Sequence, residues 1–124
     1  METKLCSICF NETLENPCAF CRDNTRNGQV IAVVETSSDI SSLENQGFKG
    51  RYHVLQGVIS PRDGIGPDQL RIRQLIERIE HSDINELVVY LPDTNEGDAT
   101  AMTIMQDLQR MGLSRIKLTR IDLG

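Results

Sequence analysis

The sequence predicts an α/β protein in which a small cysteine-rich region precedes a domain built on a parallel β-sheet. Two observations predict this fold class. All four cysteines lie in two Cys-x-x-Cys pairs near the N-terminus, separated by eight residues. The rest of the chain alternates strand-like apolar runs with amphipathic stretches, an order that favours parallel strands joined by right-handed crossovers. We therefore divide the chain into a zinc finger, residues 1–28, and an α/β domain, residues 29–124.

The four cysteines, Cys6, Cys9, Cys18 and Cys21, are predicted to bind one structural Zn²⁺. A two-residue gap forms a tight turn that brings both thiolates of a pair to one ion, and two such turns complete a tetrahedral site. Four protein ligands leave no position for water, so the site would be structural and not catalytic. The alternatives are two disulfides or four reduced thiols in a core. No signal peptide precedes the cysteines, and we expect a reducing compartment.

Composition limits the classes of partner that the chain can bind. The chain has 124 residues, a formal net charge of −5, and no apolar run near the ~20 residues that span a bilayer. We therefore expect a cytoplasmic protein that does not enter the membrane. An acidic chain with scattered basic residues binds a phosphate backbone weakly. The residues predicted to make this weak nucleic-acid contact are Arg22, Arg26, Lys49 and Arg51.

Four apolar runs are predicted to be the strands of the sheet. Residues 30–34 are a continuous, mostly β-branched run, typical of a central strand buried on both faces. Asn27-Gly28 is a turn signal just before this run. Three glycines and two prolines in residues 57–67 predict an irregular loop. The other strands are expected at residues 52–55, 86–91 and 116–121.

Three helices are predicted between the strands. The first begins at about Asp39, after possible capping residues at 36–38, and Gly47 ends it. The second begins at Asp68, and its apolar positions follow helical spacing at Ile72, Leu75, Ile76 and Ile79. The third spans residues 99–111, and its predicted apolar face holds Ala101, Met102, Met105 and Leu108.

Carboxylates are expected to gather where the parallel strands end, because that edge of the sheet carries the functional loops. Glu35, Asp93, Glu96 and Asp98 would meet there. Such a group could hold Mg²⁺, or it could be an acidic, solvated rim. His53 lies in a predicted strand, and we interpret it as a hydrogen-bonded packing residue and not a catalytic base. The sequence has no Gly-x-Ser-x-Gly elbow and no phosphate-binding Gly-x-x-x-x-Gly-Lys loop.

The order of these features resembles the bacterial recombination mediator family RecR. The matching segments are the four cysteines, Val33-Val34-Glu35, residues 52–57, residues 60–68 and residues 96–101. The resemblance implies a zinc finger followed by a Toprim domain, the α/β module shared with topoisomerases and primases. In catalytic Toprim members, a strand-end Glu acts beside an Asp-x-Asp pair that holds Mg²⁺. Glu35 matches the Glu, but Pro92 and Thr94 occupy the positions of the pair, so we expect no enzymatic activity.

The resemblance also implies a role in DNA repair and homologous recombination. RecR-like proteins dock RecO- and RecF-like partners that help load recombinase on single-stranded or gapped DNA. Glu35, Glu96 and Asp98 are the predicted partner-binding residues. The family's N-terminal helix-hairpin-helix and its C-terminal segment, which helps close a ring, are not in this sequence, and a homo-oligomer stays open. The alternatives are a metal-dependent Toprim nuclease or phosphotransferase, and a stand-alone zinc and Toprim interaction module.

Overall fold

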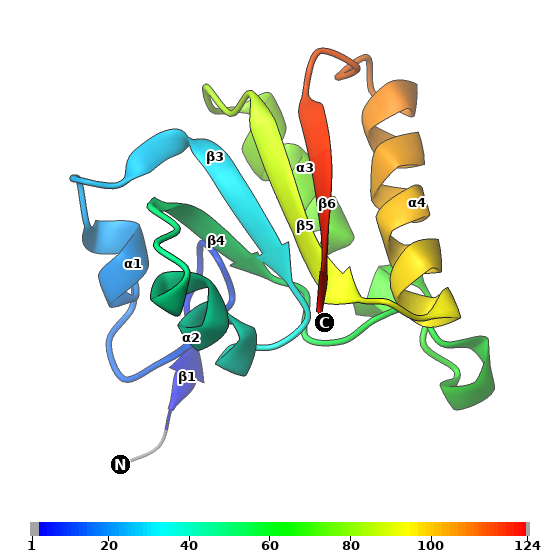
Figure 1. The fold of residues 1–124 in the computed structure, drawn as a ribbon, viewed down its shortest axis with the longest axis horizontal. Helices are drawn as coiled ribbons and strands as arrows, with labels where there is room; N and C mark the ends of the chain where they lie inside the picture. The colour runs from blue at the N-terminus through cyan, green and yellow to red at the C-terminus, as the bar shows by residue number, and fades with distance from the viewer. Residues whose placement is uncertain (1–2, 124) are drawn as a thin grey trace.

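The computed structural model describes residues 3–123 and contains a four-stranded parallel sheet with helices on both of its faces (Figure 1). The predicted α/β class is confirmed. The strand order is β4-β3-β5-β6, which leaves β4 and β6 at the edges. The strands are β3 (Asn27–Val34), β4 (Gly50–Val54), β5 (Glu86–Pro92) and β6 (Lys117–Leu123).

The cysteine-rich region packs at the β4 edge of the sheet. We call residues 3–26 the cysteine finger. It contains a two-stranded antiparallel pair, β1 (Lys4–Leu5) and β2 (Glu12–Thr13), and one short helix, α1 (Ala19–Arg22). The finger has little secondary structure and few apolar residues. A core this small does not order a chain by itself, so other interactions must stabilise the finger.

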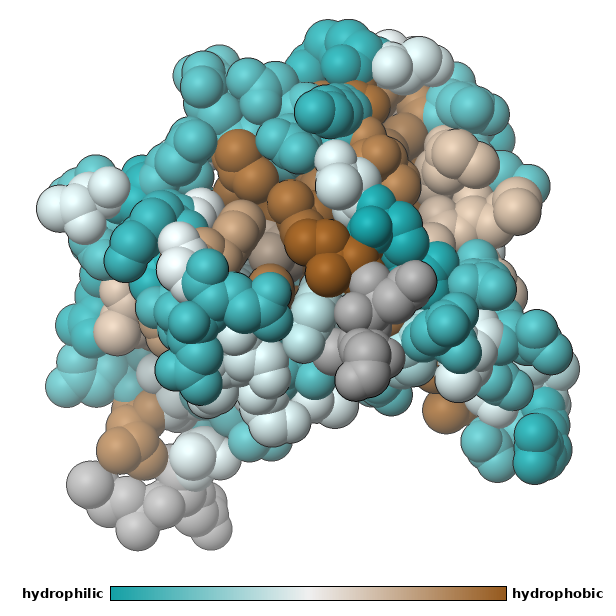
Figure 2. Space-filling view, in the orientation of Figure 1, coloured by the Kyte–Doolittle hydropathy of each residue, from teal (hydrophilic) through white to brown (hydrophobic). Residues whose placement is uncertain are grey.

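Each face of the sheet has its own apolar core. Helices α3 (Ile72–Glu80) and α4 (Asn95–Arg110) cover one face, where Ile31 and Val33 of β3 are fully buried. The shorter α2 (Ser38–Asn45) covers part of the other face, over Ala32 and Val34. Apolar side chains gather at the centre of this second face (Figure 2), where no helix lies in front of β5 (Figure 1). Within residues 3–123, no helix has the length and apolar composition needed to cross a membrane.

Three predicted element boundaries are wrong, namely the starts of β3, α3 and α4. Asn27 and Gly28 are not a turn, because β3 already begins at Asn27 and shifts register with β4 between Asn27 and Ile31. Helix α3 begins at Ile72 and not at Asp68. Pro67 starts a separate 3₁₀ turn, η2 (Pro67–Gln69), and Leu70 is then extended and buried, which breaks the helical path.

Helix α4 begins one turn earlier than predicted, at Asn95. The hydroxyl of Thr94 accepts a hydrogen bond from the Gly97 amide at 3.0 Å, which caps the helix. A Cβ on Gly97 would lie 2.0 Å from the carbonyl oxygen of Pro92, so only glycine allows this close contact between the helix and the end of β5.

The predicted apolar face of α4 is also partly wrong. Met102 and Met105 are 51% and 39% exposed, whereas Ile104 is fully buried. The residues that α4 buries are Gly97, Thr100, Ala101, Ile104 and Leu108. These positions follow the period of 3.6 residues, and starting the helix at Asn95 places Ile104 on the same stripe as Gly97 and Ala101.

Candidate metal centre and Toprim edge

The structure brings the four predicted cysteine ligands together. Their sulfur atoms all lie within 4.8 Å of one another, and Cys6, Cys9 and Cys18 are buried. The separations are 3.7 Å between Cys6 Sγ and Cys21 Sγ and 3.5 Å between Cys9 Sγ and Cys18 Sγ. A tetrahedron with metal–sulfur bonds of ~2.3 Å has sulfur–sulfur edges of about 3.8 Å. The cluster therefore has the dimensions of a four-thiolate metal site, and its cysteines are free and not disulfide-bonded.

Backbone amides of the finger point at its sulfur atoms. The amides of Ile8 and Cys18 each donate to Cys6 Sγ at 3.4 Å. Phe10 adopts a positive φ of 65°, and its amide donates to the carbonyl oxygen of Cys6, which closes the first tight turn. N–H groups directed at sulfur stabilise a thiolate, the form that binds metal.

The crowded sulfurs share protons when no cation is bound. The hydrogen bond between Cys21 and Cys18 raises the pKa of Cys21 to about 12. A hydrogen bond with Cys18 also raises the pKa of Cys9. Hydrogen bonds from Cys21 and Cys9 lower the pKa of Cys18. Four thiolates so close together repel one another, and a divalent cation removes that repulsion by displacing the protons. The donor set thus fits a soft, tetrahedral ion such as Zn²⁺.

The cysteine finger covers the edge of β4 that does not pair with β3. The Val54 amide donates to the carbonyl oxygen of Cys9 at 2.7 Å, and the Arg51 Nη1 donates to the carbonyl oxygen of Cys21 at 2.9 Å. Two finger rings pack edge-on against β4, with centroids 5.6 Å apart for Phe10 and His53 and 5.2 Å apart for Phe20 and Tyr52. Neighbouring strand residues point to opposite faces, so the finger straddles the edge and shields it from other strands.

Arg26, predicted as a nucleic-acid contact, lies in the joint between the finger and the α/β domain. Its guanidinium forms an ion pair with Glu44 at 2.6 Å and donates to the carbonyl oxygen of Gly50 at 3.0 Å. It also lies over the rings of Phe20, at 4.8 Å, and Tyr52, at 5.5 Å. The Tyr52 hydroxyl donates to the same Glu44 carboxylate. No pattern in the sequence predicted this cluster, because its members are up to 32 residues apart and no motif contains them.

The other three predicted nucleic-acid contacts differ in exposure. Arg22 is exposed and forms an ion pair with Glu15 at 3.0 Å. Lys49 is exposed, next to the start of β4. Arg51 is partly buried and donates to Phe20 and Cys21 of the finger. The structure therefore leaves Arg22 and Lys49 open to solvent, whereas Arg26 and Arg51 make contacts within the chain.

Two of the predicted acidic residues share a pocket at the carboxyl edge of the sheet. Glu35 follows β3, Glu96 lies in the first turn of α4, and both line a shallow pocket of about 420 Å³. Burial raises the pKa of Glu35, and the negative charge of Asp39 adds to this effect. The loop after β4, which the sequence predicted to be irregular, contributes Arg62 and Asp63 to the same pocket.

The four predicted carboxylates do not assemble as a Mg²⁺ site. Asp98 forms an ion pair with Arg120 at 3.1 Å, and neither Asp98 nor Asp93 lines the pocket. In the part of the chain that the structure describes, the four cysteines are the only group of three or more His, Cys, Asp or Glu residues placed to hold an ion. Of the four carboxylates, Glu35 and Glu96 therefore share the pocket, whereas Asp93 and Asp98 lie outside its lining.

His53 is confirmed as a hydrogen-bonded packing residue. Its side chain is fully buried, and its Nε2 lies 2.9 Å from the carbonyl oxygen of Arg71. Nε2 must carry the hydrogen, since a carbonyl oxygen only accepts, and this leaves Nδ1 to accept from Arg78 at 3.3 Å. Burial lowers the pKa of His53 to about 3, so the ring is neutral.

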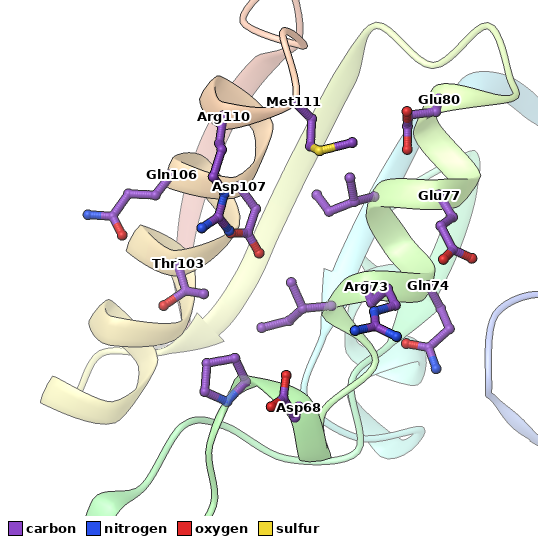
Figure 3. Close-up of a pocket in the computed structure, with 13 residues that line it drawn as sticks. Asp68, Arg73, Gln74, Glu77, Glu80, Thr103, Gln106, Asp107, Arg110 and Met111 are labelled. Carbon is purple, nitrogen blue, oxygen red and sulfur yellow. The ribbon is translucent and has the colours of Figure 1, made fainter.

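A larger pocket of about 750 Å³ lies between α3 and α4 (Figure 3). Side chains of both signs line it, among them Arg73 and Glu77 from α3 and Asp107 and Arg110 from α4. It shares no lining residue with the pocket at the sheet edge. No feature of the sequence predicted it, because it forms only where the two helices pack side by side.

Comparison with known proteins identifies the family. Residues 19–121 match the Toprim domain family. The chain is 48% identical over 122 residues to the recombination protein RecR of Desulfatibacillum aliphaticivorans, a match that covers 98% of this chain and 60% of that relative. It is 49% identical over 121 residues to the recombination protein RecR of Myxococcus xanthus, covering 97% of this chain and 60% of that relative.

A third relative, the recombination protein RecR of Streptococcus gordonii, is 45% identical over 124 residues, which is 99% of this chain and 61% of the relative. The chain thus spans about 60% of the length of the curated relatives that it matches. The resemblance to RecR that the motifs indicated is confirmed. The chain belongs to the Toprim domain family, and over nearly its whole length it is similar to recombination proteins named RecR.

Proposed function

We propose that this chain is the zinc-finger and Toprim part of a RecR-like recombination mediator, which acts in DNA repair and recombination by docking partner proteins and not by catalysis. The names of its relatives support the biological role. The observation that carries the non-catalytic part is the sheet edge: Pro92 and Thr94 stand where a Toprim enzyme has its metal-binding pair, and the nearby carboxylates do not form an ion site.

An activity assay tests the absence of catalysis. The full chain is incubated with supercoiled and single-stranded DNA in the presence of Mg²⁺ or Mn²⁺, and we expect no cleavage, religation or priming. The matched variant is Glu35→Gln, which removes the one carboxylate that corresponds to the catalytic Glu of Toprim enzymes. Activity in the wild type that disappears in Glu35→Gln would establish the alternative, a metal-dependent nuclease or phosphotransferase.

The structural cofactor of the proposed function is one Zn²⁺, held by Cys6, Cys9, Cys18 and Cys21. The ion would supply free energy that the small apolar content of the finger does not provide, and it would take no part in a reaction. Four reduced thiols also suit a reducing compartment, so we propose a cytoplasmic location. We propose residues 1–28 as the zinc-finger domain and residues 29–124 as the Toprim-like domain, a boundary that falls two residues inside β3.

Elemental analysis tests the zinc assignment. Protein purified without chelator should contain one Zn²⁺ per chain, and Cys18→Ser should lose it together with the ordered finger. Ser7→Ala is the control, because Ser7 is exposed beside the cluster and supplies no sulfur. Absence of zinc from the wild-type chain would refute the assignment.

Partner docking is proposed at the acidic pocket. Glu35 and Glu96 face the same shallow hollow, and Asp98 lies beside it in the first turn of α4. Such a surface would steer a basic patch on a RecO-like or RecF-like protein. Single-stranded or gapped DNA would be bound chiefly by the larger assembly, with a weak contribution from the exposed Arg22 and Lys49. Self-association belongs to the same assembly and stays a prediction.

A further inference from the structure

Arg78 of α3 packs toward β4 without an acidic partner. Its Nη1 donates to the carbonyl oxygen of Tyr52 at 2.7 Å and to Nδ1 of His53 at 3.3 Å. Among the side chains of residues 3–121, no carboxylate lies within ion-pair distance of it. Both hydrogen-bond partners are neutral. This guanidinium is partly removed from water and is held only by neutral groups. A nearby negative charge would stabilise it, because uncompensated burial of a cation costs free energy.

The cysteine cluster, a source of negative charge, lies at the same open edge of β4 that Arg78 contacts. Arg78 and the finger both bond to the same short stretch of this strand: Tyr52 and His53 contact Arg78, and Arg51 and Val54 contact the carbonyl oxygens of Cys21 and Cys9. Burial lowers the pKa of Arg78, and negative charge on Cys21 and Cys9, the thiolate form that binds metal, would oppose this effect. Arg51 adds a second cation close to Arg78, which increases the need for an anion.

A loaded metal site would provide that anion. Four thiolates and one divalent ion carry two net negative charges, and burial at the finger shields them from water. We propose that Arg78 is a positioning residue for the metal centre: its charge stabilises the metal–thiolate cluster at the open edge of β4 and couples metal binding to the docking of the finger on the sheet. This inference rests on the proposed metal site, but it does not require any partner-docking role.

The first test measures metal affinity on the full chain. Zn²⁺ binding is determined by competition with a chelator for the wild type, Arg78→Met, Arg78→Lys and the control Arg73→Met. Arg73 lies on the exposed face of the same helix, so the control makes the same substitution away from β4. We expect Arg78→Met to weaken Zn²⁺ binding by about 10-fold or more, as loss of an outer-sphere partner does. Arg78→Lys keeps the charge and should lose less, and Arg73→Met should bind as the wild type does.

A second readout separates this role from simple packing, since Arg78→Met also removes two hydrogen bonds within the α/β domain. The unfolding midpoint of each variant is measured with saturating Zn²⁺ and with chelator. The proposal predicts a larger drop for Arg78→Met in the loaded protein than in the metal-free protein. Equal drops in the two states, or unchanged affinity, would overturn the proposal while leaving the zinc assignment intact. A wild-type chain that binds no Zn²⁺ in the same titration would overturn both.

Discussion

The buried His53 makes the stability of the sheet depend on pH in a way that can be calculated. Its ring lies between β4 and the start of α3, and only the neutral form with hydrogen on Nε2 satisfies both Arg71 and Arg78. Protonation would place a second cation beside the Arg78 guanidinium. The perturbation is therefore a fall in pH, and the matched variant is His53→Gln, whose amide offers one donor and one acceptor but does not titrate.

The sign and size follow from proton binding in the two states. In the unfolded chain His53 takes up a proton near pH 6.5, whereas in the folded chain its pKa is lowered to about 3. The stability that the neutral ring supports is thus fully present above pH 6.5 and is lost as the pH falls toward 3. Within this window each pH unit costs about 1.4 kcal/mol, so lowering the pH from about 7.5 to about 5 should cost about 2 kcal/mol.

Urea unfolding followed by circular dichroism at both pH values, with saturating Zn²⁺ throughout, measures this cost. The wild type should lose about 2 kcal/mol more than His53→Gln over the interval. His81→Gln is the control, because His81 is exposed at the end of α3, and it should behave as the wild type does. If the wild type and His53→Gln lose the same stability, the buried neutral histidine is not the cause and the reasoning fails.

Three further predictions concern single side chains. Arg26→Met should lower the free energy of unfolding by about 2 kcal/mol, because it leaves the carbonyl oxygen of Gly50 without its donor and Glu44 without its ion-pair partner. Arg22→Met, at an exposed ion pair, should cost less than about 1 kcal/mol in the same denaturant titration. Gly97→Ala should destabilise the protein by about 1–3 kcal/mol in thermal unfolding, because the added Cβ would collide with the carbonyl oxygen of Pro92. Gly28→Ala is the control and should be close to neutral, because open space surrounds Gly28, and equal effects of the two variants would contradict the close contact. Glu35 binds its proton more tightly in the folded state because burial raises its pKa, so stability falls as the pH rises through that pKa. Glu35→Gln should therefore raise the calorimetric unfolding midpoint at pH 7 but not near pH 4, and a lower midpoint at pH 7 would show that the carboxylate stabilises the fold.

Local patterns in the sequence were enough to predict the main architecture. The paired cysteine spacing predicted one four-sulfur cluster, and the sulfur atoms do converge. The β-branched run at residues 30–34 predicted a central strand, and β3 lies between β4 and β5 with both faces covered. These features depend on residues close together in the chain, where spacing and periodicity fix the geometry.

What the sequence did not predict depends on contacts between distant segments. The start of α4 is set by the Thr94 cap and by the approach of Gly97 to Pro92, and a helical period alone does not locate it. Arg26 and Arg78 look like ordinary surface charges in the sequence, yet each contacts β4 from an element far along the chain. Asp98 has the spacing of an edge carboxylate, but the neighbouring β6 supplies Arg120 and engages it in an ion pair.

The central claim is that the acidic pocket docks a basic partner, and the most direct measurement is the affinity of the full chain for a RecO-like protein at low and high salt. The double variant Glu35→Gln with Glu96→Gln removes two of the three pocket carboxylates and leaves Asp63 in place. The double variant Glu77→Gln with Glu80→Gln removes two exposed charges on α3 as a matched control. The account predicts that the pocket variant binds at least about tenfold more weakly and with a flatter salt dependence, while the control binds normally. Unchanged binding by a folded pocket variant would contradict it.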